Sequence, residues 1–410
     1  MKPPKWLTTG VLVLAAVKLF DQAQSTMLFG PFPTLLDIHG MRFLVPWISW
    51  SGTFGALLGS FLAKWFTLQV GTKKITIISF FVTTITPLLY AFGIINQAIG
   101  WLLVTRFIAS FAGALSTIGT FALLRMILSP DSKPHQKGNA LNITMGAVGS
   151  SLAIAVGFGF FIEHPLLWGS TVSVLNTVTL VSFIRLRVDP EVDVQRKPAV
   201  EGDFKKTRKP SEVRYLIGEY FLPYIGMYMA HGATQQYAPY SVQHSTWLKG
   251  GISLIVYATM MAFGSWIAIW LQRTQNTESD ATQSEAQMRK RAKKVVRFSL
   301  VTMVMGLVIV ITATSGPVQF LIGFGVIAFA KGLLDNPLEY LANQTNDKVA
   351  VGAAKQIVFN LSNLPVAGLA VFFGMENIWL SVLLVGPVLW AIVRIVQKRS
   401  SHRNTNKRIV

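Results

Sequence analysis

Apolar runs of about 20 residues alternate along this chain with short polar connections, and the basic residues gather on one side of that alternation. Of the 37 Lys and Arg residues, 32 fall on this side. Arg42 and Lys249 fall on the other side, while Lys18, Arg106 and Lys331 lie deep within the apolar runs. Cytoplasmic loops keep their Lys and Arg because moving a positive charge across a membrane is disfavoured. The pattern predicts an all-α, polytopic membrane protein with both termini in the cytoplasm.

Composition excludes several other classes of protein. A net charge of +19 would suit a soluble nucleic-acid binder, but such a protein would not place its charges between long apolar runs. The mean hydropathy is +0.47, and only 13% of residues are charged, against about 25% in soluble proteins. The chain has no cysteine and no HExxH or GxxxxGK[ST] sequence, so thiolate, zinc and ATP sites have no support. We expect no enzyme activity, no catalytic residue, no metal, no cofactor and no nucleic-acid partner.

The apolar runs divide into twelve predicted spans, since the bilayer core of about 30 Å needs roughly 20 residues per helix. They are placed at 6–29, 41–64, 74–95, 98–124, 139–162, 166–187, 213–236, 250–272, 297–315, 317–341, 351–373 and 376–397. The polar stretch 188–212 predicts a cytoplasmic linker between two six-helix halves, 1–187 and 213–397. A basic cytoplasmic tail follows at 398–410. A second polar stretch, 273–294, ends in a basic cluster that we interpret as a positive-inside anchor beside membrane lipids.

Two six-helix halves joined by a cytoplasmic linker resemble the major facilitator superfamily, whose halves pack around a central path. Local motifs add to this resemblance. The connection after the second span carries Gly71 followed by Lys73 and Lys74, similar to the glycine turn and basic residues of the family's gating loop. The family's Asp in this loop falls on Ala63 or Leu68 here. Arg106 is similar to an arginine that the family keeps inside its fourth helix.

The fifth span carries small residues at four-residue spacing, namely Gly149, Ala153 and Gly157. Drug/proton antiporters of the same superfamily have a G-x-x-x-G-P-x-x-G-G pattern at this point, although Ile154 replaces the proline here. Small residues let helix backbones approach closely in any membrane protein. We therefore predict that these three residues serve helix packing.

The resemblance implies a secondary active transporter of the plasma membrane, the inner membrane if the cell is bacterial. It implies proton-coupled export of a small or amphiphilic solute by alternating access. Three alternatives stay open: a proton-coupled uptake permease, a lipid flippase of the same fold, and a receptor that has lost transport. The expected partners are a small-molecule substrate, protons and membrane lipids, and we expect a monomer.

Ionisable residues inside the spans are the main candidates for function, because a buried charge in a bilayer is costly. Asp21 in the first span and Arg106 in the fourth each lie about eight residues from the outer surface. Both are therefore roughly 12 Å deep, at 1.5 Å per residue, and could form a proton-sensitive ion pair. Lys18 lies three residues before Asp21 on the same helix face and is an alternative partner. A static pair that only fixes packing is the competing interpretation.

Other polar residues within the spans need internal partners, since lipid offers none. Lys331 and Asp335 are a natural i,i+4 pair, and Glu339 continues the same face of the tenth span. A cytoplasmic gate, a substrate contact and a structural pair are all consistent with this spacing. The predicted cavity-lining residues are Gln22, His231, Gln235, Gln236, Tyr237, Lys331 and Asp335.

Overall fold

The computed structural model describes residues 8–29, 31–128, 133–160, 164–186, 212–241, 247–272, 281–313, 317–342 and 348–373, with Val382 and Val385. Every regular element in these ranges is a helix. The predicted linker (except Glu212), the twelfth predicted span (except Val382 and Val385) and the basic tail lie outside the described residues.

The first six predicted spans correspond to long helices. The elements of this half are α1 (Thr9–Phe29), α2 (Pro31–Ile38), η1 (Arg42–Leu44), α3 (Val45–Val70), α4 (Thr72–Ile95), α5 (Ile99–Ile127), α6 (Lys133–Phe160) and α7 (Pro165–Ile184). Pro46 lies in the first turn of α3, at a position where its missing N–H costs nothing. Gly71 has a φ of 92°, a left-handed conformation that glycine adopts freely. It lets α3 turn directly into α4, as the Gly71 motif predicted.

The second half repeats the long helices with two departures from the predicted spans. Its elements are α9 (Glu212–Leu216), η2 (Ile217–Phe221), η3 (Leu222–Tyr224), α10 (Ile225–Ser241), α11 (Trp247–Gln272), α12 (Ala281–Ile311), α13 (Pro317–Ala342) and α14 (Lys348–Phe373). The seventh span is interrupted by the π turn η2 and the 3-10 turn η3, because Pro223 has no N–H to donate and its ring clashes with the preceding turn. The helix α12 begins at Ala281, before the predicted 297, since its Ala, Gln, Lys and Arg residues favour helix.

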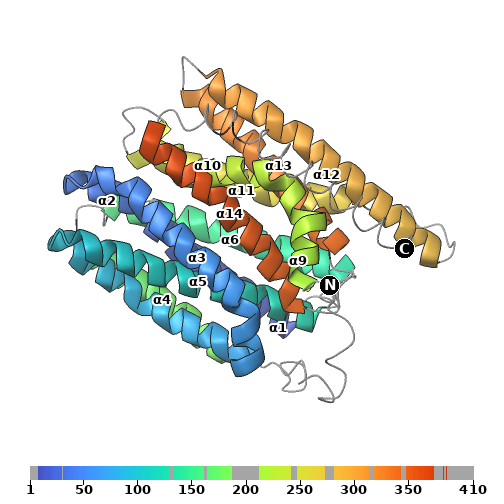
Figure 1. Cartoon of the computed structure of the whole chain (residues 1–410), viewed down its shortest axis with the longest axis horizontal. Coiled ribbons are helices and arrows are strands. Elements are labelled where there is room, and N and C mark those ends of the chain that lie inside the picture. Colours follow the sequence, from blue (N-terminus) through green and yellow to red (C-terminus); the bar gives the residue numbers. More distant parts are fainter. Residues whose placement is uncertain are drawn as a thin grey trace, which may run out of the picture.

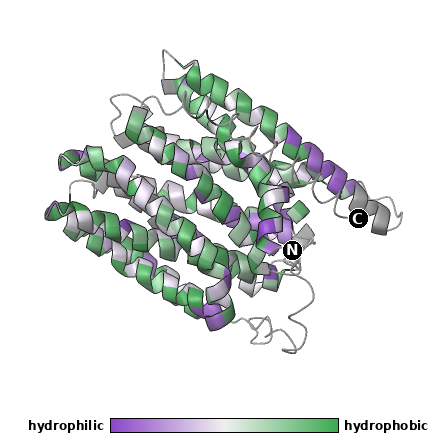
Figure 2. Ribbon diagram, in the orientation of Figure 1, coloured by the Kyte–Doolittle hydropathy of each residue, from purple (hydrophilic) through white to green (hydrophobic). Residues whose placement is uncertain are grey.

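Length and composition fit a membrane protein. Within the described residues, six stretches are long and apolar enough to cross a bilayer: Thr72–Ile95, Ile99–Ile127, Pro165–Ile184, Ile252–Gln272, Gln287–Ile311 and Val318–Ala342. Figure 2 shows hydrophobic residues along the lengths of the helices and hydrophilic residues near α9 and along the first part of α12. We call the end of the helix bundle at which α7 ends (Ile184) and α9 begins (Glu212) the linker end.

Each half has its own packing, and a smaller set of contacts joins the halves. In the first half α3 packs on α5 and α1 on α6, while in the second α13 packs between α11 and α12. Val382 contributes to the apolar core of the second half. Between halves, α14 lies along α3 and α5, and α11 lies along α6. Figure 1 shows α14 beside α3, at the boundary between the blue-to-green half and the yellow-to-red half.

Candidate functional site

A network of charged side chains is buried on one face of α13. Lys331 and Asp335 form the ion pair that their spacing predicted, and Glu339 lies one turn further along. Lys355 of α14 connects the two carboxylates. Its Nζ donates to Glu339 Oε1 at 2.6 Å and lies 3.4 Å from Asp335 Oδ2. The network therefore spans two helices of the second half before it reaches the first.

The same network continues into the first half. Arg125, near the end of α5, has a guanidinium nitrogen 3.9 Å from Glu339 Oε2. Asn139, near the start of α6, donates from Nδ2 to Asn336 Oδ1 at 2.5 Å and to Glu339 Oε2 at 3.3 Å. Two further hydrogen bonds cross between the halves: Asn360 to Ser60 at 3.3 Å and Trp266 to Thr144 at 2.9 Å. These contacts lie between the linker end and the middle of the helices, so they hold the two halves together there.

Three cations and two carboxylates make up this network: Arg125, Lys331, Lys355, Asp335 and Glu339. A buried ion needs several partners to offset its lost hydration. Asp335 has two cationic partners, and Glu339 has two cations and an amide. Removing the first half would strip Glu339 of its Arg125 and Asn139 contacts. The network is therefore complete only when the two halves are in contact.

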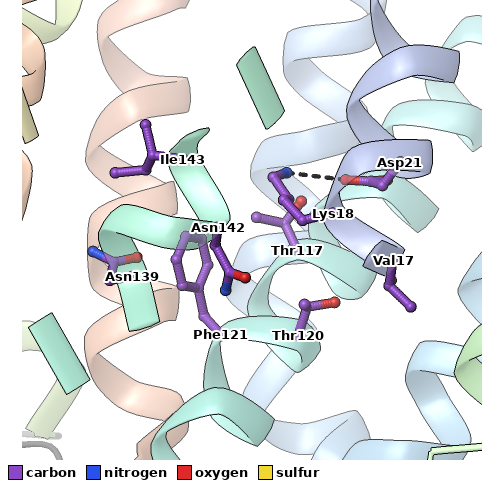
Figure 3. Close-up of a pocket in the computed structure, with 9 residues that line it drawn as sticks. All are labelled: Val17, Lys18, Asp21, Thr117, Thr120, Phe121, Asn139, Asn142 and Ile143. Atoms are coloured by element: carbon purple, nitrogen blue, oxygen red, sulfur yellow. Dashed lines mark hydrogen bonds and ion pairs between the residues drawn. The ribbon is translucent and has the colours of Figure 1, made fainter. Parts of the chain in front are cut away.

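A cavity lies next to this network, between α1, α5 and α6. It contains about 400 Å³ of empty space, part of it open to solvent. Its lining consists of Val17, Lys18, Asp21, Thr117, Thr120, Phe121, Asn139, Asn142 and Ile143. The Lys18 ammonium donates to Asp21 Oδ2 at 3.0 Å on the cavity wall. Figure 3 shows this pair on α1, across the cavity from Asn139 and Ile143.

Two residues belong to both the cavity and the network. Asn139 lines the cavity and also bonds to α13. Phe121 lines the cavity, and the Lys355 Nζ lies 5.5 Å from the centre of its ring, a distance typical of a cation–π contact. Binding in the cavity can therefore affect the charged network through the Asn139 amide and the Phe121 ring.

The sequence-predicted ionisable residues take the following places. The alternative pair, Lys18 with Asp21, forms. Arg106 packs against α3, where a Cβ at Gly52 would overlap its guanidinium, and it lies within interaction range of the Tyr90 hydroxyl. Contact between Arg106 and Asp21 stays a prediction. Gln22 packs against α6, 3.5 Å from where a Cβ of Gly146 would lie.

Other predicted residues are partly described. The ring of His231 is hydrogen-bonded to the Tyr257 hydroxyl and packs against Phe359, with ring centroids 5.4 Å apart. His231 is therefore held in the second half and is not part of the cavity lining described above. The side chains of Gln235, Gln236 and Tyr237 lie outside the description.

The predicted loop and packing residues also have defined places. Lys73 and Lys74 occupy the first turn of α4, directly after the Gly71 turn. At Gly149, α6 approaches α1 so closely that a Cβ would overlap the Leu19 carbonyl. Ala153 is buried in an apolar cluster with Ala23, and the surroundings of Gly157 lie outside the description.

Sequence reasoning missed part of both sites. In the network it missed Arg125, Asn139, Asn336 and Lys355, and in the cavity Thr117, Thr120, Phe121 and Asn142. A usable signal existed for Lys355, because it lies inside the predicted span 351–373 although its charge was assigned to the cytoplasmic side. The polar residues of α5 and α6 gave no such signal, since Asn and Thr in membrane helices commonly serve packing.

The fold and the buried polar site define a membrane transporter. Residues 14–364 match the model of the Major Facilitator Superfamily, and the chain belongs to that family. It is an integral membrane protein with the superfamily's all-helical fold of two six-helix halves. Members of the family are transporters and not enzymes. A search of curated protein sequences finds no match.

Solved structures share the fold at low sequence identity. The human organic anion transporter MFSD10 (TETRAN) is 13% identical, with a TM-score of 0.63 over 96% of this chain and 100% of that one. A bacterial homologue of the iron transporter ferroportin, in an outward-facing state, is 12% identical, with a TM-score of 0.67 over 94% and 100%. The transporter FucP in its outward conformation is 11% identical, with a TM-score of 0.64 over 96% and 99%.

Proposed function

We propose that this protein is a proton-coupled secondary transporter that exports a small or amphiphilic solute by alternating access. The observation that carries the proposal is the Lys18–Asp21 ion pair on the wall of the cavity. A carboxylate at membrane depth is by default a functional group. Protonation of Asp21 would neutralise it and release Lys18, so proton binding would change the charge that a solute meets in the cavity.

Alternating access requires contacts between the halves that form in one state and break in another. The bonds from Arg125 and Asn139 to Glu339 have this character, because each joins the first half to the second. They are concentrated toward the linker end. If the linker end faces the cytoplasm, these contacts close the cytoplasmic side of the protein in this state.

The orientation has its own test. A reporter fused after Lys206 or at the C-terminus should give a cytoplasmic signal, and reporters near Arg42 or Lys249 should give an external one. The expectation follows from the one-sided distribution of basic residues. An external signal from the linker would show that the closed end faces outside. It would also contradict the prediction that 188–212 is a cytoplasmic linker between two six-helix halves.

The export direction rests on the resemblance of the small-residue helix five to antiporters, so uptake is the second candidate. The two differ in the sign of the pH gradient that drives accumulation. A solute screen in inverted vesicles with an acidic interior should show solute entering the vesicles if the protein exports in the cell. Accumulation only in right-side-out vesicles with an alkaline interior would establish uptake, and movement of fluorescent lipid alone would establish a flippase.

Proton coupling is tested at Asp21. Asp21→Asn should abolish transport driven by a pH gradient, while solute counterflow without a gradient continues, because exchange needs no net deprotonation. Asp37→Asn is the matched control, since Asp37 is an exposed carboxylate at the end of α2. Full gradient-driven transport in Asp21→Asn would contradict the coupling role.

A further inference from the structure

One side of the cavity presents hydrogen-bond acceptors, and the orientation of Asn139 is fixed by its neighbours. The Asn139 Nδ2 lies 2.5 Å from Asn336 Oδ1 and 3.3 Å from a Glu339 carboxylate oxygen. The Glu339 carboxylate, paired with Lys355, can only accept hydrogen bonds, so the atom that faces it must be the amide nitrogen. The Asn139 Oδ1 must then point the other way. Figure 3 shows it directed away from α13 toward the cavity.

This oxygen lacks a partner within the described structure. Asn139 is 2% exposed, and its Oδ1 accepts no hydrogen bond there. Asn142, three residues on along α6, also lines the cavity: it is 5% exposed and its Oδ1 has no partner in the described part. A buried polar atom without a hydrogen bond costs about 1–3 kcal/mol. Two such atoms on one wall of a cavity need donors. Both have almost no accessible surface in this arrangement, so a donor from an occupant reaches them after a small movement of the wall.

The charges around the cavity select against charged occupants. Lys18 and Asp21 on the wall neutralise each other, and three cations with two carboxylates lie beyond Phe121. This balance disfavours a cation. An anion would meet the Asp21 carboxylate and two amide oxygens, which are all acceptors, and the Lys18 ammonium on the same wall is already paired with Asp21. A neutral group with O–H donors satisfies the wall without adding charge.

We propose that the cavity binds a neutral, hydroxylated solute whose O–H groups donate to the amide oxygens of Asn139 and Asn142. The ring of Phe121 and the side chains of Val17 and Ile143 give its carbon skeleton an apolar surface. Part of the cavity is open to solvent, so a bound solute can extend beyond the lining residues. The inference rests on the proposed function and names the substrate class of the same cavity.

The geometry also links binding to the contact between the halves. Asn139 accepts from the solute through Oδ1 and donates to Asn336 and Glu339 through Nδ2. Hydrogen bonds that share an amide polarise one another, so an occupied cavity strengthens the bonds to α13. Asn139 therefore both recognises the solute and holds the linker end closed while the solute is bound.

The absence of cysteine from the chain gives a direct binding assay. A single cysteine placed in the cavity by Thr117→Cys, or by Thr120→Cys in a second protein, is labelled with N-ethylmaleimide in the purified, full-length transporter. Three probes with one six-carbon polyol skeleton are then tested for protection: sorbitol (neutral), gluconate (anionic) and 1-amino-1-deoxysorbitol (cationic). We expect sorbitol to slow labelling at concentrations at which the charged probes do not.

Three variants assign the protection to the amide oxygens. Asn139→Leu and Asn142→Leu should each raise the half-protecting sorbitol concentration about tenfold, the effect of one lost hydrogen bond. Asn142→Leu leaves the inter-half bonds of Asn139 intact and serves if Asn139→Leu does not fold. Asn176→Leu is the matched control: Asn176 of α7 is also buried with an unpartnered Oδ1 in the described part, but donates to the Thr83 carbonyl away from the cavity lining. Its protection should be unchanged.

Several results would overturn the proposal. They are equal or stronger protection by gluconate or the amine, no protection by sorbitol, unchanged protection in both asparagine variants, and no labelling at either cysteine. The assay uses no pH gradient. Protection by sorbitol together with undiminished gradient-driven transport in Asp21→Asn would contradict only the proton coupling, so the two failures are distinguishable.

Discussion

Ser60 and Asn360 are 300 residues apart in the sequence, and the Asn360 amide donates to the Ser60 hydroxyl at 3.3 Å. Both side chains are buried, one on α3 of the first half and the other on α14 of the second. The bond lies on the surface along which the two halves meet. We expect a rocking motion that opens the linker end to separate these two residues.

A cross-link at this position should stop transport. Ser60→Cys with Asn360→Cys, joined by a short bifunctional methanethiosulfonate, is expected to abolish solute flux, and reduction should restore it, because the bridge prevents the halves from separating. The control is a cysteine pair at Thr83 and Asn176, which lie side by side within the first half. Flux that continues through a fully cross-linked Ser60/Asn360 pair would show that the halves do not move apart here.

Lys355 should be essential for stability because it serves both carboxylates of α13. Lys355→Met leaves Glu339 with a 3.9 Å contact to Arg125 and Asn139 as partners. Losing one member of a buried ion pair typically costs about 3–5 kcal/mol, measured here by unfolding in mixed detergent micelles. Adding Glu339→Gln should recover a large part of that loss. Lys74→Met, an exposed lysine of α4, should change little, and additive losses in the double variant would contradict a direct pairing.

Gly149 should tolerate no side chain. A Cβ there would overlap the Leu19 carbonyl of α1, so Gly149→Ala should destabilise the protein by about 1–3 kcal/mol, as overpacking does. Gly113 of α5 is the matched control, since a Cβ at Gly113 would meet nothing within 4 Å. Gly113→Ala should be neutral or stabilising by up to about 1 kcal/mol through helix propensity. Equal effects at both positions in thermal unfolding would contradict the close approach of α6 and α1.

The partner of Asp21 can be decided by two double-mutant cycles. One combines Asp21→Asn with Arg106→Gln, and the other combines it with Lys18→Met. The structure places Lys18 3.0 Å from Asp21, so the Lys18 cycle should give a non-additive unfolding free energy of about 0.5–3 kcal/mol. The depth argument predicts coupling to Arg106 as well. Additive losses in the Arg106 cycle would remove the Asp21–Arg106 gate and leave Lys18 as the functional partner.

Patterns in the sequence were enough to predict the class of protein, most of the helices that the structure describes and the ion pairs within single helices. Apolar runs and one-sided basic residues identify membrane helices because the bilayer imposes a fixed length and a fixed cost of translocating charge. The Lys331–Asp335 and Lys18–Asp21 pairs were readable because residues three or four apart in a helix share a face. The Gly71 turn was readable because few residues other than glycine adopt a positive φ.

The contacts between helices, and therefore the location of the site, became known from the three-dimensional structure. Arg125, Asn139, Glu339 and Lys355 lie on four different helices, and no periodicity within one helix links them. The sequence pattern assigned Lys355 to the cytoplasmic side, whereas the fold brings its side chain between Asp335 and Glu339 of α13. From the sequence, Asn139 was likewise only the first residue of the predicted span 139–162. Contacts between helices depend on three-dimensional packing of whole surfaces, which a one-dimensional pattern of residues does not specify.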